Sequence, residues 1–182
     1  QEAGYDVYGA TMNQFDGQDL TEAQEMADFL GIPHKVIDVR KMYQDVVLSY
    51  FVDSYKNGIT PNPCMMCDFK IKFGFFYDTV RAYFDCPYFA TGHYARITYD
   101  GKYQVEKAAD IAKDQSYMMY HLTQDQLAHI LFPLGRMYKK DTRRISEEKG
   151  LPTYNKAESQ DICFLTSEKS YAEFLQNHAP EA

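Results

Sequence analysis

Cysteines are the side chains in this sequence that are best suited to group-transfer chemistry, and there are four of them: Cys64, Cys67, Cys86 and Cys163. Cys64 and Cys67 form a Cys-x-x-Cys pair, which can be half of a zinc site, a redox pair or part of an iron–sulfur site. A four-cysteine zinc site needs a second close pair, and the other two cysteines are far apart in the sequence. Structural zinc is therefore the weakest of these interpretations.

The residues around Cys67 and Cys163 predict different environments for these two cysteines. The residues after Cys67 are typical of a helix, so this thiol is expected at a helix N-terminus, where the helix dipole stabilises a thiolate. Lys70 and Lys72 would add positive charge one turn further on. Cys163 follows two carboxylates within residues 158–164 (ESQDICF), and carboxylates raise the pKa of a nearby thiol. Cys67 is therefore predicted to be the better activated thiol of the two.

Three further segments carry polar side chains in positions that suit a ligand. The Thr-Pro-Asn-Pro loop is rigid and could hold Asn62 and Pro63 in a fixed position, although its prolines could equally do no more than separate two helices. Gly92 and His93 directly follow a predicted strand, and ligands of open α/β sheets lie beyond the carboxyl ends of strands. Lys113 could bind phosphate. Each signal is weak when taken alone.

The composition is that of a globular protein with one ordinary domain. The 182 residues are 45% hydrophobic and 25% charged, with no apolar run long enough to span a membrane and no signal-peptide pattern, so a cytoplasmic location without membrane contact is expected. The net charge of −7 argues mildly against a dedicated nucleic-acid module. Local basic patches at residues 70–72 and 139–144 could still contact RNA, although solvated helix faces are the more ordinary explanation of the second.

The hydrophobic pattern predicts an α/β fold with a parallel sheet. A strand over residues 5–12, a helix over 20–30 that Gly31 ends, and a strand over 34–39 form a βαβ unit. Residues 57–67 contain one glycine and two prolines and are expected to be irregular. The other predicted elements are helices over 41–55, 68–84, 123–131, 140–149 and 170–177, a strand over 88–91, and a hairpin over 96–106 that turns at Asp100-Gly101.

In order along the chain, these segments resemble one family, the tRNA-specific 2-thiouridylases. The matching stretches are GYDVYGATM, MADFLGIPH, TPNPCMMCDFKIKF, YFATGHYAR, KDQSYMMYHL, LFPLGRMYK and ESQDICFL. The resemblance implies a Rossmann-like N-type ATP pyrophosphatase domain of the adenine nucleotide alpha hydrolase type. It also implies that ATP with Mg²⁺ adenylates the C2 oxygen of the wobble uridine of tRNA, and that a persulfide sulfur then displaces AMP. The implied partners are tRNA and a sulfur-donor protein, either a cysteine desulfurase or a relay protein.

The resemblance assigns roles residue by residue. Cys67 matches the family's nucleophile, and Cys163 matches the cysteine that carries the persulfide, with which Cys67 reacts to release sulfide or to form a disulfide after transfer. Met12 and Gly92 match adenylate-contact positions. The positions that match contacts to the tRNA or its target base are Asn62, Pro63, Cys64, His93, Lys113, Asp114 and Gln115.

Two departures from the family pattern affect these expectations. The family's phosphate-binding loop, Ser-Gly-Gly-x-Asp-Ser, would precede the strand at Tyr5 and is not in the sequence. Residues 1–130 are therefore expected to be a partial catalytic domain, truncated at the N-terminus and unable by itself to activate uridine. Residues 131–182 are expected to be a helical segment that carries the second cysteine, without the family's downstream β-rich domains. Cys64 stands where many members carry an Asp, which puts an acid–base role at that position in doubt.

Two alternatives stay open from the sequence. Cys64, Cys67 and Cys163 could together ligate a 4Fe–4S cluster with one open iron for sulfide. The chain could also be a non-catalytic RNA-binding or interaction fragment, because it lacks the ATP loop.

Overall fold

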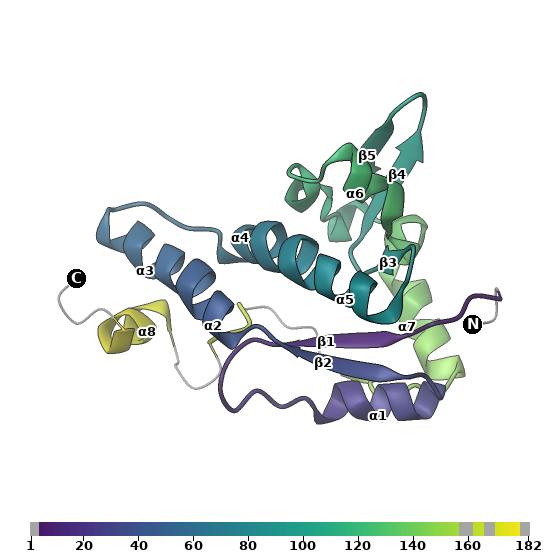
Figure 1. The fold of residues 1–182 in the computed structure, drawn as a ribbon, viewed down its shortest axis with the longest axis horizontal. Coiled ribbons are helices and arrows are strands. Elements are labelled where there is room, and N and C mark those ends of the chain that lie inside the picture. The colour runs from purple at the N-terminus through teal and green to yellow at the C-terminus, as the bar shows by residue number, and fades with distance from the viewer. Residues whose placement is uncertain (1–3, 157–161, 166–169, 179–182) are drawn as a thin grey trace.

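The structure is a computed structural model that describes residues 4–156, 162–165 and 170–178. Its helices and strands alternate over the first half of the chain, as Figure 1 shows. In chain order the elements are β1 (Gly9–Asn13), α1 (Thr21–Leu30), β2 (His34–Asp38), α2 (Arg40–Tyr43), η1 (Gln44–Leu48), α3 (Ser49–Lys56), α4 (Pro63–Cys67), η2 (Asp68–Phe76), α5 (Tyr77–Phe84), β3 (Phe89–Ala90), β4 (Ala95–Tyr99), β5 (Tyr103–Lys107), η3 (Ile111–Lys113), η4 (Ser116–Met119), α6 (Gln124–His129), β6 (Ile130–Leu131), η5 (Pro133–Arg136), α7 (Lys139–Glu148) and α8 (Tyr171–His178).

The predicted βαβ unit is confirmed, although its first strand covers Gly9–Asn13 rather than residues 5–12. Strands β1 and β2 pair in parallel from Gly9 opposite His34 to Asn13 opposite Asp38. Helix α1 ends at Gly31, which adopts the left-handed conformation with φ of 62°, a region that glycine enters without strain. In Figure 1, α1 lies on one face of the β1–β2 pair and the α4–α5 helical run lies on the other. The unit therefore has the helix-covered parallel strands of an α/β fold.

The remaining strands form two more pairs. The hairpin is confirmed, with β4 and β5 antiparallel and Gly101 in the turn at φ of 71°. Strand β3 pairs in parallel with β6, which the sequence did not predict, because residues 123–131 read as one helix. The helix ends at His129 instead, since Ile130 becomes extended and is buried, and the neighbouring Leu131 carbonyl accepts the N–H of Thr91.

The expectation of an irregular segment over residues 57–67 is wrong for its last five residues. Asn62 caps a helix there, because its Oδ1 accepts the backbone N–H of Met65 at 3.1 Å. Pro63 occupies the first helical position, where a missing N–H costs no hydrogen bond. Helix α4 therefore starts before Cys64, and it runs on through the π-helical η2 into α5, with a kink at Gly74.

The hydrophobic core joins the C-terminal segment to the helices of the N-terminal half. The ring of Phe164 packs edge-on against Phe51 of α3 with ring centroids 5.1 Å apart, and also contacts Tyr43 of α2. Phe174 of α8 packs on the same Phe51 ring at 5.7 Å. All four rings are buried, so this aromatic cluster fixes the short segment that carries Cys163. In the described part of the chain, no helix is both long enough and apolar enough to span a bilayer.

Candidate active site: a cysteine pair beside a cavity

Two cysteines lie three residues apart on α4. Residues separated by three positions share one face of a helix. Cys67 is buried in the core cluster, whereas Cys64 is exposed. One helix turn therefore offers an inner thiol and an outer thiol.

Cys163 approaches this helix from the far end of the chain. The Sγ atom of Cys163 lies 3.0 Å from the hydroxyl of Tyr43, and the side chain is otherwise exposed. Burial, the charge of Cys163 and the hydrogen bond to it all raise the pKa of Tyr43, so the phenol stays protonated at neutral pH. A protonated phenol can donate its hydrogen to a thiolate at Cys163.

Gln14 connects the two sulfurs. Its Nε2 atom lies 3.8 Å from Sγ of Cys67 and 3.8 Å from Sγ of Cys163. The fold therefore brings together the two cysteines that the sequence singled out, although they come from distant parts of the chain. Neither Gln14 nor Tyr43 was a predicted site residue. Gln14 does lie just beyond the carboxyl end of β1, where ligands of α/β sheets gather, and this position could have indicated it.

The predicted activation of Cys67 is wrong. Burial raises the pKa of the Cys67 thiol to about 12; the charge of Lys72 opposes this rise, while Asp68 and the other cysteines add to it. The helix dipole acts mainly within the first turn, and Cys67 is the last residue of α4 rather than its first. Burial also leads the rise in the pKa of Cys64. Loss of water around the thiol therefore outweighs the helix terminus.

A network of charged side chains begins at Asp68, the residue after Cys67. Asp68, whose side chain is 1% exposed, forms an ion pair with Lys72 one helical turn away, and its Oδ2 faces Nε2 of His93 at 3.5 Å. Burial, the largest influence, would raise the pKa of Asp68, but the neighbouring imidazole of His93 and the charge of Lys72 together hold it below its usual value. Asp68 therefore remains a carboxylate at neutral pH.

The predicted RNA contacts divide into two groups. His93 is buried, and its Nδ1 lies 2.8 Å from the Thr91 hydroxyl. Asp114 accepts the backbone N–H of Ala108 at 2.6 Å, and Gln115 accepts that of Tyr94 at 3.0 Å, so these side chains hold the protein's own loops. Lys113 is the last residue of the short helix η3. Asn62 and Pro63, by contrast, begin the helix that carries the cysteines. A contact with RNA at any of these positions stays a prediction.

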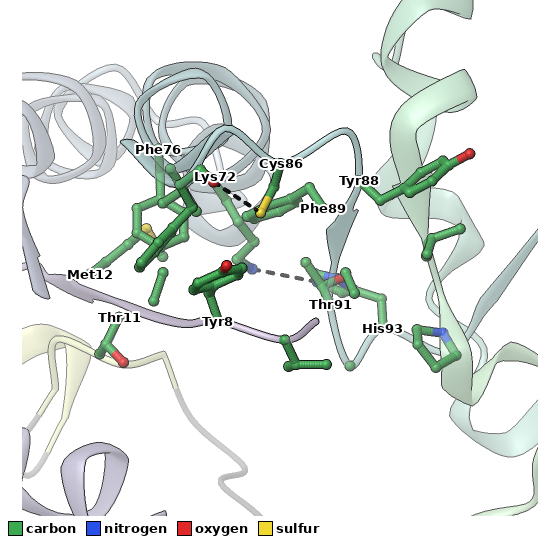
Figure 2. A pocket seen from close by; sticks show the side chains of 18 of the residues that line it. Tyr8, Thr11, Met12, Lys72, Phe76, Cys86, Tyr88, Phe89, Thr91 and His93 are labelled. Atoms are coloured by element: carbon green, nitrogen blue, oxygen red, sulfur yellow. Dashed lines mark hydrogen bonds between the residues drawn. The ribbon is translucent and has the colours of Figure 1, made fainter. Parts of the chain in front are cut away.

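A cavity of about 1330 Å³ lies between β1, the helical run and the β3 loop, and Cys86 rather than Cys64, Cys67 or Cys163 is in its lining. Figure 2 shows Met12 from β1, Tyr8 just before that strand, Phe76 and Lys72 from the helical run, and the β3 loop around the same space. Both predicted adenylate positions line this cavity, Met12 from β1 and Gly92 from the loop after β3. Gln14 also lines the cavity, so one side chain touches both this space and the two sulfurs.

The three cysteines proposed as cluster ligands do not form a preassembled metal site. Within residues 4–156, 162–165 and 170–178, no group of three or more His, Cys, Asp or Glu side chains has an arrangement that could hold a metal ion. The carboxylates predicted to influence Cys163, Glu158 and Asp161, lie outside the described residues.

The comparison with known protein families decides where this chain belongs. Residues 2–167 match the family model described as the tRNA methyl transferase HUP domain. The chain belongs to this family. The Rossmann-like α/β fold expected from the sequence is thereby confirmed, and so is the resemblance on which the expected roles rest.

Individual relatives carry a common name. Proteins called tRNA-specific 2-thiouridylase MnmA are similar to this chain, with 43% identity in Nostoc punctiforme, 45% in Trichormus variabilis and 39% in Clostridioides difficile. These matches cover 98%, 96% and 98% of this chain, and 54%, 52% and 54% of the relatives. The chain thus spans about half the length of the curated relatives it matches.

Proposed function

We propose that this chain serves in the formation of 2-thiouridine in tRNA. ATP with Mg²⁺ would adenylate the uridine C2 oxygen, and a persulfide on Cys163 would deliver the sulfur in exchange for AMP. A cysteine desulfurase or a relay protein would load Cys163 in the cytoplasm. The observation that carries the proposal is the pair of contacts from Gln14 to Sγ of Cys67 and to Sγ of Cys163.

The cysteine pair suits this reaction better than a methyl transfer, which the family description names. A two-cysteine transfer can be written so that atoms and electrons balance. The terminal sulfur of the Cys163 persulfide bonds to the uridine carbon as AMP leaves. The Cys67 thiol then loses its proton and attacks Sγ of Cys163, the bond to the terminal sulfur breaks, and the electron pair of that bond leaves with the thiolated uridine, which takes up one proton. A Cys67–Cys163 disulfide remains, and a dithiol reductant must restore it.

The cavity could hold the nucleotide, and Gln14, which lines it, connects it to the sulfurs of Cys67 and Cys163. Its walls hold aromatic rings on which an adenine could stack and one ammonium, that of Lys72, which could meet a phosphate. A Cβ added at Gly92 would meet only one side-chain atom, at 3.8 Å, so the loop leaves free space toward the cavity. When bound, ATP supplies the leaving group, and the residues of this chain hold the base and keep the sulfurs nearby.

The high pKa of Cys67 also suits a resolving role. A thiol with a pKa of about 12 is almost entirely protonated at pH 7 and rarely reacts with solvent oxidants. The thiol becomes a nucleophile when it loses its proton. A buried Cys67 would therefore react with the loaded Cys163 rather than with solvent oxidants. Cys163 is exposed, as a cysteine loaded by another protein must be.

The experiment that tests the proposal measures 2-thiouridine in tRNA. Cells whose only copy of the full-length protein carries Cys67→Ser or Cys163→Ser are expected to lose the modification, with protein level unchanged. Cys86→Ser removes a thiol from the cavity lining without touching the other sulfurs, because Sγ of Cys86 contacts the carbonyl of Phe84, so it separates an effect on the cavity from an effect on sulfur transfer. If tRNA is still thiolated in both variants, the cysteines are structural and the proposal fails.

A further inference from the structure

The side-chain amide of Gln14 is not needed to hold the loop that follows β1. Its backbone N–H donates to Oε1 of Gln18 at 2.7 Å, and Nε2 of Gln18 donates in turn to the carbonyl of Met12 at 3.2 Å. These two bonds fold the loop after β1 back on the end of the strand. The loop is thereby fixed without the Gln14 amide, which reaches instead to Cys67 and Cys163.

We propose that Gln14 and Tyr43 are positioning residues that hold Sγ of Cys67 against Sγ of Cys163 for sulfur exchange. The proposal rests on the function proposed above. A primary amide has two N–H groups, so Gln14 can donate one hydrogen to each sulfur at the same time. The hydroxyl of Tyr43 lies 3.0 Å from Sγ of Cys163 and can donate a further hydrogen to it.

These donors match the charge that the exchange produces. Negative charge begins on Sγ of Cys67, passes through Sγ of Cys163 as the new Sγ–Sγ bond forms, and leaves with the outgoing sulfur. Hydrogen bonds from N–H and O–H groups stabilise a charged acceptor more strongly than a neutral one. Donors already aimed at both sulfurs need no rearrangement during the step. Gln14 therefore would stabilise the attacking and the attacked sulfur together, and Tyr43 only the attacked one.

The test replaces the persulfide with a coloured mimic. In a chain with Cys64→Ser and Cys86→Ser, Cys163 is converted to its mixed disulfide with nitrothiobenzoate, and release of that thiol is followed by visible absorbance. Attack by Cys67 on Sγ of Cys163 forms the same bond and breaks the corresponding one. Gln14→Leu is expected to slow this first-order release at least about tenfold, the usual scale for losing a charge-assisted hydrogen bond. Gln44→Leu, an exposed glutamine beside Tyr43, is the matched control and is expected to be unchanged.

Gln14→Glu separates hydrogen bonding from packing. Glutamate has nearly the shape of glutamine, so it would be milder than leucine if Gln14 only filled space. It replaces both donors with acceptor oxygens and a negative charge, so it is expected to be slower than leucine above about pH 5. Tyr43→Phe removes the hydroxyl that lies 3.0 Å from Sγ of Cys163 and is expected to slow the same release about tenfold. Tyr99→Phe, on the exposed hairpin, should leave the release rate unchanged.

Release in Gln14→Leu at the rate of Gln44→Leu, with the fold intact by circular dichroism, would overturn the proposal. A glutamate variant faster than the leucine variant would overturn it as well. Failure of the function itself has a different signature, since thiolation of tRNA would persist in Cys67→Ser cells while the release measurement continued to depend on Gln14.

Discussion

Replacing Lys72 with methionine should destabilise the fold far more than its partly exposed position suggests. Lys72 is the ion-pair partner of Asp68, whose side chain is 1% exposed. Nε2 of His93 also faces this carboxylate, at 3.5 Å from its Oδ2. Methionine keeps the length of the side chain but removes the charge, which leaves a buried carboxylate without its cation. Breaking a buried pair in this way costs about 3–5 kcal/mol.

The expected loss should depend on pH. The pKa of Asp68 is held below its usual value, so the stability that its charged form contributes is present at neutral pH and is lost as the pH falls below about 4. In Lys72→Met the unpaired carboxylate would take up a proton more readily, which removes the buried charge. The difference in stability between wild type and variant should therefore shrink in acid.

Equilibrium unfolding in guanidinium, followed by circular dichroism, measures both effects. The double variant Asp68→Asn with Lys72→Met should recover most of the loss, because no unpaired charge remains. Lys70→Met is the matched control on the same helix, and its ammonium lies 4.2 Å from the ring centroid of Phe69 at an exposed site. It should cost no more than about 1 kcal/mol. A cost for Lys72→Met that is no larger than that of Lys70→Met would refute the reasoning.

Four further outcomes are expected. The alkylation rate of Cys67, whose thiol pKa is about 12, should keep rising above about pH 10, and a plateau below pH 9 would contradict the burial argument. Gly135→Ala should cost at least about 2 kcal/mol, because its Cβ would lie 1.8 Å from the backbone oxygen of Ala95; an unchanged melting temperature would disprove this contact. Gly92→Ala should melt like wild type, since its Cβ would meet only a methyl carbon at 3.8 Å. Asn62→Ala should lose about 1 kcal/mol in urea unfolding as the cap of α4 disappears, and no loss would mean that another group caps the helix.

Local sequence signals were sufficient where one segment decides its own structure. The periodicity of residues 20–30 and the glycine after them determined α1, and the Asp-Gly pair determined the turn of the hairpin. The same signals misread the start of α4, because the prolines that interrupt one helix also begin the next. They missed β6 as well, since a two-residue strand exists only through its partner β3.

The sequence by itself determined the family, the α/β fold and the two cysteines, because ordered motifs and hydrophobic periods are properties of residues close together in the chain. Only the tertiary structure decided that Gln14 and Tyr43 meet those cysteines, and that Met12 and Gly92 share one cavity. It also reversed the predicted ionisation of Cys67. The physical reason is that the pKa of a thiol depends on how much water reaches it and on charges brought near it by folding, and neither is set by its neighbours in the sequence.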